Sequence, residues 1–247
     1  MTTDLPVPGR ALAVGAHPDD IEFGCGGTLA KWAAAGCVLL HVVCTDGSRG
    51  TWDPATDPAR LVLRRQEEQR AASRALGGTG EVVFLGWPDG ELEPGLRQRW
   101  QVADAIRRFK PDVVLGHDPW KRYRVHPDHR NAGFLLTDAL VAARDPLFFP
   151  ELGAGPHRPA TLLLFEADEP DHAEDVSGFV EVKIAALMAH ESQLESTMHI
   201  GAAGSAATDE AVRQHDAFVG RLRNRLAEGA APFGLELAET FKLVGDL

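Results

Sequence analysis

The sequence predicts a doubly wound α/β fold, in which a mostly parallel sheet carries helices on both faces. Short apolar runs recur along the chain, segments with helical periodicity follow them, and glycine or proline marks the junctions. Right-handed crossovers between parallel strands cover both faces of a sheet with helices. With 247 residues, of which 44% are hydrophobic, the chain can bury a substantial core, so we expect one domain over residues 1–247.

Five apolar runs bounded by turn-forming residues are predicted strands: 11–16, 38–44, 81–86, 112–116 and 161–167. In the common order of such sheets, the third, second and first strands lie on one side and the fourth and fifth on the other. The first and fourth strands are then neighbours at the switch point, where ligands bind beyond the carboxyl ends of the strands. The predicted architecture is therefore Rossmann-like.

Six segments with helical patterns are predicted helices: 26–36, 59–76, 96–109, 131–143, about 180–194 and about 209–228. The second is the clearest, because it has a charged face opposite its apolar positions and Gly77 closes it. The third stops before Pro111. Residues 45–54 are rich in turn formers and too long for a tight connection, so we expect a loop over the carboxyl edge of the sheet.

Charge and cysteine content restrict the partner and the compartment. The chain has 25 basic and 36 acidic residues and a formal charge of −11, which repels nucleic acid and anionic membranes and favours a small-molecule partner. Cys25, Cys37 and Cys44 form no CxxC pair, as suits a reducing cytosol. The N-terminus lacks a signal-peptide pattern and no window approaches a membrane span, so we expect a cytoplasmic protein. A homo-oligomer remains open.

Two clusters of histidine and aspartate follow predicted strands. His17-Pro18-Asp19-Asp20 lies directly behind the first strand, and His126-Pro127-Asp128-His129 lies beyond the fourth. Such groups are costly to desolvate unless a cation lies among them. If the two strands are neighbours, both clusters reach the same edge of the sheet, which predicts a shared metal site.

The order of these motifs resembles a known family. Residues 16–20 (AHPDD) with Glu22 and the run 26–29 (GGTL), then Arg65-x-x-Glu68, the second cluster, Lys183 and His190-x-x-Gln193, are similar to the LmbE/PIG-L family of zinc-dependent N-deacetylases acting on N-acetylglucosamine derivatives. The resemblance runs from about residue 11 to residue 193. It implies an LmbE-like fold and a Zn²⁺-dependent hydrolase, with Fe²⁺ as an alternative metal, that deacetylates an amino-sugar conjugate.

The resemblance also assigns roles to residues. It implies three metal ligands, His17, Asp20 and His129. Asp19 corresponds to the general base that takes a proton from metal-activated water. His126 corresponds to the residue that stabilises the oxyanion and protonates the departing amine, and Asp128 to the acid that orients His126 and keeps it cationic.

Three further residues concern the substrate. Arg65 corresponds to the substrate-contacting arginine of the family. Asp89, in a turn after the third predicted strand, is our candidate for sugar hydroxyl contacts. Some members carry a tyrosine shortly before the second cluster that polarises the carbonyl, but the only tyrosine here, Tyr123, is separated from His126 by two residues.

Other interpretations compete with these assignments. The ligand residues could be ordinary helix-capping turn residues, Asp19 an N-cap, and Arg65 and Glu68 a helical ion pair. We take His117, His190 and Glu22 for packing or supporting groups, and Cys25 for a residue outside the metal site.

Other functions also stay open. They are an amidase that cleaves a larger acyl group from an amino-sugar or thiol conjugate, a non-catalytic metal-stabilised sugar-binding domain, a metallophosphoesterase, and a dinucleotide site weakly suggested by Gly24-x-Gly26.

Overall fold

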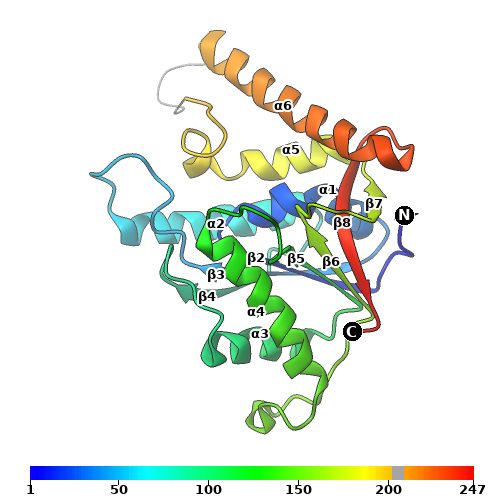
Figure 1. Cartoon of the computed structure of the whole chain (residues 1–247). Coiled ribbons are helices and arrows are strands. Elements are labelled where there is room, and N and C mark those ends of the chain that lie inside the picture. Colours follow the sequence, from blue (N-terminus) through cyan, green and yellow to red (C-terminus); the bar gives the residue numbers. More distant parts are fainter. Residues whose placement is uncertain (202–208) are drawn as a thin grey trace.

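One eight-stranded sheet forms the centre of the molecule, and helices cover both of its faces (Figure 1). The computed structural model describes residues 1–201 and 209–247. The strand order is β1-β7-β8-β6-β5-β2-β3-β4. The predicted α/β class with a mostly parallel sheet is confirmed.

The five predicted strands form the parallel part of the sheet. In spatial order they are β4 (Val82–Trp87), β3 (Val38–Thr45), β2 (Arg10–Gly15), β5 (Val113–His117) and β6 (Thr161–Phe165). This is the order that the sequence predicts. Strands β2 and β5 pair directly, with Ala11 opposite Val113, so the residues that follow them leave the same edge of the sheet.

Three strands beyond β6 were not predicted. β8 (Ala238–Gly245) runs antiparallel to both β6 and β7 (His172–Asp175), and β1 (Thr2–Thr3) pairs in parallel with β7. The sequence signal is weak because β1 and β7 are short and β8 mixes exposed with buried positions. Consequently the C-terminal segment of the chain returns to the sheet beside the predicted strands.

The six predicted helices are present: α1 (Asp20–Ala34), α2 (Pro58–Ala75), α3 (Leu96–Phe109), α4 (Pro127–Arg144), α5 (Val180–Met188) and α6 (Asp209–Ala230). Three 3₁₀ turns are added, η1 (Pro150–Leu152), η2 (Glu191–Gln193) and η3 (Ala231–Phe233). Helices α1 and α4 begin earlier than predicted. Both histidine-and-aspartate motifs therefore lie at the first turn of a helix, and residues 46–57 form the predicted loop.

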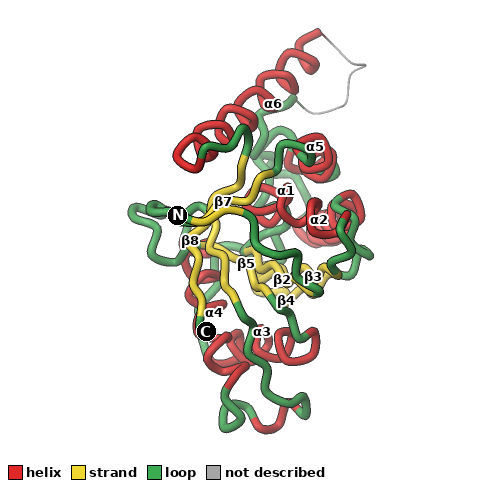
Figure 2. Tube along the Cα trace, turned by 90° about the vertical axis from the view of Figure 1, so that its right-hand side faces the viewer, coloured by secondary structure: helices red, strands yellow, loops and turns green. Residues whose placement is uncertain are grey.

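The layers follow from the alternation of side chains along β2. Leu12 and Val14 point into the core beneath α3 and α4, and Ala11 and Ala13 point into the core beneath α1 and α2. Helix α6 forms an outer layer on α5 (Figure 2). Its residues Phe218, Leu222 and Leu226 are buried in the cluster between the two helices. Among the described residues, no helix is long and apolar enough to cross a membrane.

Candidate active site

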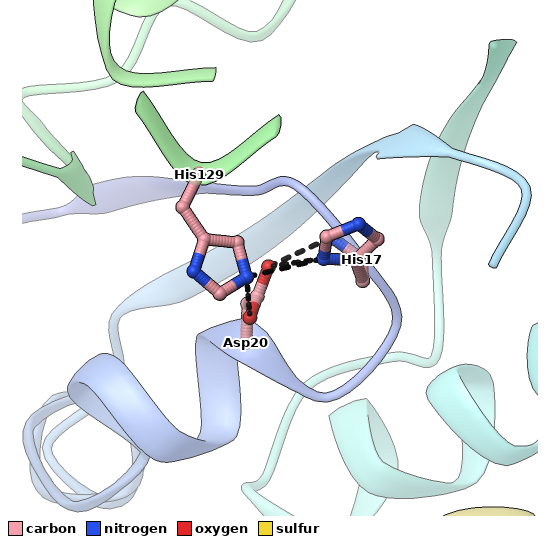
Figure 3. Close-up of side chains that lie close together, drawn as sticks. All are labelled: His17, Asp20 and His129. Atoms are coloured by element: carbon pink, nitrogen blue, oxygen red, sulfur yellow. Dashed lines mark hydrogen bonds and ion pairs between the residues drawn. The ribbon is translucent and has the colours of Figure 1, made fainter. Parts of the chain in front are cut away.

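Three side chains from two helix starts meet at the carboxyl ends of β2 and β5 (Figure 3). His17 comes from the turn after β2, Asp20 opens α1, and His129 lies in the first turn of α4. His17 Nδ1 lies 3.2 Å from His129 Nε2 and 3.4 Å from Asp20 Oδ2. His129 Nε2 lies 3.3 Å from Asp20 Oδ1. The structure thus brings together the three residues for which the sequence predicts metal ligation.

The spacing of these atoms suits a small divalent cation. Tetrahedral coordination with bonds of about 2.0–2.1 Å separates neighbouring ligand atoms by about 3.3 Å. The observed separations of 3.2–3.4 Å match that edge length. Two imidazole nitrogens and a carboxylate leave room for water, which is the donor pattern of catalytic rather than structural zinc sites.

Asp128 holds the ring of His17 in place through a hydrogen bond to its second nitrogen. Its Oδ2 lies 3.0 Å from His17 Nε2 and accepts a bond of 2.6 Å from the Gly90 N–H, while Oδ1 accepts one of 3.2 Å from Leu92. A carboxylate on the second ring nitrogen leaves Nδ1 of His17 free for a metal. Burial opposes protonation of His17, but Asp128, Asp20 and Asp89 raise its pKa well above the usual range.

The position of Asp128 differs from the sequence expectation that it orients His126. The carboxylate bonds to His17, whereas His126 receives a bond from the Asp128 backbone N–H to its Nδ1, at 3.3 Å. His126 is the N-cap of α4, so its ring turns toward the helix N-terminus while the Asp128 side chain points back to the loop after β4.

His117 and Glu166 support the second metal-type ligand. His117 Nε2 lies 3.1 Å from Asp20 Oδ2, and its Nδ1 lies 3.3 Å from Glu166 Oε2. Burial disfavours charge on Asp20, but the neighbouring rings of His129 and His117 hold its pKa well below the usual value. His117 is therefore a supporting group, in agreement with our interpretation of the sequence.

Asp19 lies beside the ligands in an unusual backbone conformation. Its φ of 104° is rare for a residue other than glycine and costs about 1–3 kcal/mol unless surrounding contacts stabilise it. The Gln69 side chain supplies such a contact, because its Oε1 accepts a 3.0 Å bond from the Asp19 N–H. Gln69 is itself fixed by a 2.7 Å bond from Nε2 to Glu22.

The environment of Asp19 brings its pKa toward neutrality. Burial raises the pKa of this carboxyl to about 6, while Arg65 opposes the rise and Asp20 adds to it. Arg65 Nη2 lies 3.6 Å from Asp19 Oδ2 and also donates to the carbonyl of Pro18 at 2.6 Å. Such a carboxyl can exchange a proton near neutral pH.

His126 lies at the rim of the pocket with its ring centroid 4.7 Å from that of His17. Because Nδ1 accepts the backbone bond from Asp128, the neutral ring carries its proton on Nε2. Burial, together with the rings of His17 and His129, lowers the pKa of His126. Because its pKa is lowered, the protonated ring of His126 is a stronger acid.

The predicted substrate residues Arg65 and Asp89 both line the pocket. Arg65 uses Nη1 for the carbonyl of Gly47 at 2.9 Å, and its Nε has no partner among the described residues. Asp89 Oδ1 lies 3.2 Å from His17 Nε2, and Oδ2 accepts the Arg49 N–H at 3.1 Å. Both residues therefore have protein partners close to the candidate metal ligands.

The loop before α4 directs Arg124, and not Tyr123, to the site. Tyr123 is 89% exposed and does not line the pocket. Arg124 Nη1 lies 2.9 Å from His129 Nδ1, and its Nη2 pairs with Glu166. His117, His129 and Glu166 form another metal-type group, but this guanidinium already supplies a cation to it.

Our sequence reasoning did not assign roles to Gln69, Arg124 and Glu166. Glu166 directly follows β6, so the rule that placed His17 and His126 at the carboxyl edge could have found it. Gln69 lies one helical turn after Arg65 on the same face of α2, which is a weaker signal. For Arg124 the sequence offers no signal.

The site opens into a pocket of about 710 Å³. One end carries the metal-type ligands, Asp19 and His126, and the other is formed by α6 and β8. A cavity of this volume is in the range of small-molecule sites.

Comparisons with known proteins agree with this geometry. The family model PIG-L, described as GlcNAc-PI de-N-acetylase, matches residues 12–140. A diacetylchitobiose deacetylase from Thermococcus kodakarensis is 36% identical over 187 residues, covering 74% of this chain and 70% of the relative. A 1D-myo-inositol 2-acetamido-2-deoxy-alpha-D-glucopyranoside deacetylase from Actinosynnema mirum is 33% identical over 235 residues, covering 77% of this chain and 82% of the relative.

A solved structure shows the same fold over nearly the whole chain. The N,N'-diacetylchitobiose deacetylase from Pyrococcus horikoshii superposes with a TM-score of 0.83 at 27% identity, covering 96% of this chain and 84% of that one. The family model covers the two clusters, and the relatives extend the match beyond it. The chain therefore belongs to the PIG-L family of de-N-acetylases.

Proposed function

We propose that this de-N-acetylase is a zinc-dependent hydrolase that removes the acetyl group from an N-acetylglucosamine-type conjugate. The observation that carries the proposal is the set of three facing ligand residues, whose imidazole nitrogens lie 3.2 Å from each other and 3.3–3.4 Å from the two oxygens of the Asp20 carboxylate, with the Asp19 carboxyl beside them in a pocket. The substrates for which the relatives are named, diacetylchitobiose and an acetamido-glucopyranoside of inositol, support an amino-sugar substrate.

His17, Asp20 and His129 would hold the cation. When bound, a zinc ion lowers the pKa of water and polarises the amide carbonyl. Asp128 keeps His17 oriented for this role through the bond to Nε2, and His117 does the same for Asp20. The protein thus supplies rigid ligands whose second hydrogen-bonding positions are occupied.

Asp19 is the proposed general base. It takes a proton from the attacking water while Arg65, 3.6 Å away, favours its ionised form. The pKa of about 6 in the metal-free site means that the carboxylate is available near neutral pH. A bound dication would favour the ionised form further.

His126 is the proposed acid. The ring acts in its protonated form: its Nε2–H donates a hydrogen bond to the acetyl oxygen as negative charge develops there. It then gives this proton to the departing amine nitrogen and is left neutral, while the proton taken by Asp19 returns to solvent. The lowered pKa of His126 assists the second step. Arg65 and Asp89 remain the proposed contacts for sugar hydroxyl groups.

The proposal is tested by stripping the protein of metal and assaying N-acetylglucosamine conjugates for released acetate and primary amine. We expect activity only after addition of zinc or ferrous ion, and Asp19→Ala should retain the metal but lose turnover. Undiminished acetate release without metal would refute the mechanism. Longer N-acyl groups in the same panel test acetyl selectivity, and zinc-loaded protein that binds the conjugates without cleaving them would indicate the sugar-binding alternative.

A further inference from the structure

The pocket continues from the metal-type ligands to the outer helix α6. Phe23, in the first turn of α1 three residues after Asp20, meets Phe218 of α6 with ring centroids 6.3 Å apart. Both phenylalanines line the same pocket of about 710 Å³. A conjugate whose acetamido group lies at the metal-type ligands could therefore extend its second unit along α6.

Two arginines one helical turn apart line the α6 end of this pocket. Arg221 and Arg225 flank the apolar stripe of Phe218, Leu222 and Leu226, with which α6 packs on α5. Arg221 donates one bond of 3.2 Å from Nη2 to the Met198 carbonyl. Across residues 1–201 and 209–247, Arg225 has no hydrogen-bond or ion-pair partner.

The other arginines on α6 are paired with acids. Arg223, between the two, pairs with Glu181 of α5, and Arg213 pairs with Glu210. Within the described residues, Arg221 and Arg225 therefore differ in facing the pocket and having no carboxylate partner. Like charges one turn apart repel, and an anion between them would relieve the repulsion.

The charge of the pocket is divided between its two ends. Asp19, Asp20, Asp89 and Glu166 line the metal end, where Arg49, Arg65 and a dication would compensate them, whereas Arg221 and Arg225 line the α6 end. The acid of β8 at that end, Glu239, is already paired with Lys183. The chain as a whole carries a formal charge of −11, so a pair of guanidinium groups that lack a carboxylate partner among the described residues is a local feature of α6. Guanidinium forks bind carboxylate and phosphate groups preferentially.

We propose that Arg221 and Arg225 form an anion subsite that binds a carboxylate or phosphate group on the second unit of the substrate. The preferred substrate class is then an acidic conjugate of N-acetylglucosamine. This inference rests on the proposed function, because the acetamido group must lie at the metal end to place the acidic group along α6.

The test compares zinc-loaded protein on three substrates with one skeleton: the phenyl, 4-carboxyphenyl and 4-phosphonophenyl glycosides of N-acetylglucosamine. Two partly exposed ion pairs should lower KM for an acidic substrate on the order of tenfold relative to the phenyl glycoside. In the double variant Arg221→Glu/Arg225→Glu, the KM of the phenyl glycoside divided by the KM of the acidic glycoside should fall to about one or below. Arg223→Glu is the control, because it makes the same substitution on the α5 side of the helix, with half the charge change of the double variant.

A measurement of product binding tests the anion subsite independently of the proposed deacetylase activity. Titration calorimetry of the 4-carboxyphenyl glucosaminide product should show the same loss in the double variant and no loss in Arg223→Glu, whether or not any glycoside is hydrolysed. Absence of hydrolysis would overturn the proposed function alone. Equal KM and equal affinity for acidic and neutral compounds in the wild type would overturn the subsite, and a preference for only one acidic substrate would identify the anion as carboxylate or phosphate.

Discussion

The two ends of the pocket differ in how firmly their side chains are held. At the metal end, His17, Asp19 and Asp20 are less than 10% exposed, and other groups fix each of them, including Asp128, Gln69 and His117. At the α6 end, Arg221 donates a hydrogen bond to the Met198 carbonyl, and both Arg221 and Arg225 are exposed. The difference suggests that the reaction depends on a rigid cluster, whereas substrate choice depends on one outer helix that can vary without disturbing it.

The largest effect should come from the metal end. Asp19→Asn keeps the shape of the side chain but removes the base, so kcat should fall by the ~10²–10⁴-fold typical of a lost general base. Zinc content, measured by atomic absorption, should stay at the wild-type level. The same change at exposed Asp216 on α6 is the control and should leave kcat within twofold, about the scatter of such assays. Loss of zinc from Asp19→Asn would instead make Asp19 a ligand.

Gln69 tests whether rigidity itself matters at this end. Gln69→Leu removes the acceptor of the Asp19 N–H and the donor to Glu22, so the strained turn should relax and displace the base. Because small misplacements of reacting groups cost up to about 10²-fold, kcat should fall by about that factor with KM little changed. Gln66→Leu, the same change three residues earlier on α2, is the control. Equal kcat in both variants would mean that the Asp19 conformation needs no support from Gln69.

The stability of the metal-free protein should depend on pH through the metal end. Despite their burial, His17 and His117 have raised pKa values because carboxylates surround them. A raised pKa stabilises the folded state fully below the unfolded value of about 6.5, and this contribution is lost as pH rises through the folded value. The melting temperature of metal-free protein should therefore decline as the pH rises above about 6.5.

Zinc should reduce this decline of the melting temperature, because metal binding displaces protons from the ligand side chains and becomes stronger as the pH rises. Thermal melts with and without zinc across this range provide the measurement. A metal-free protein whose melting temperature increases toward alkaline pH would contradict the assigned protonation of the two histidines.

The smallest effect should come from Tyr123. Its side chain is 89% exposed and lies outside both ends of the pocket, so Tyr123→Phe should change kcat/KM by less than about twofold. Steady-state assays on the phenyl glycoside measure this. A loss of tenfold or more would show that the loop before α4 moves to bring the hydroxyl group to the carbonyl.

The parallel half of the fold and its motifs could be predicted from the sequence. The carboxyl ends of parallel strands share one edge, so the pairing of β2 with β5 is enough to bring His17 and Asp20 near His129. The apolar runs and the residues that follow them predicted the shared site, and the family resemblance supplied the choice of the three ligands.

The remainder depends on contacts between distant segments that leave no local pattern. Glu239 of β8 accepts the backbone N–H groups of Gly27 and Thr28, just past the kink of α1 at Cys25, and pairs with Lys183. The partner of Asp128 likewise follows from the direction of one side chain at the start of α4. Neither contact could be deduced from spacing in the chain.

The central claim is that His17, Asp20 and His129 share one catalytic metal ion, and anomalous diffraction at the zinc edge from crystals of zinc-loaded protein tests it most directly. The account predicts one strong peak bounded by His17 Nδ1, His129 Nε2 and the Asp20 carboxylate. A peak among His17, Asp89 and His126, or among His117, His129 and Glu166, would contradict it.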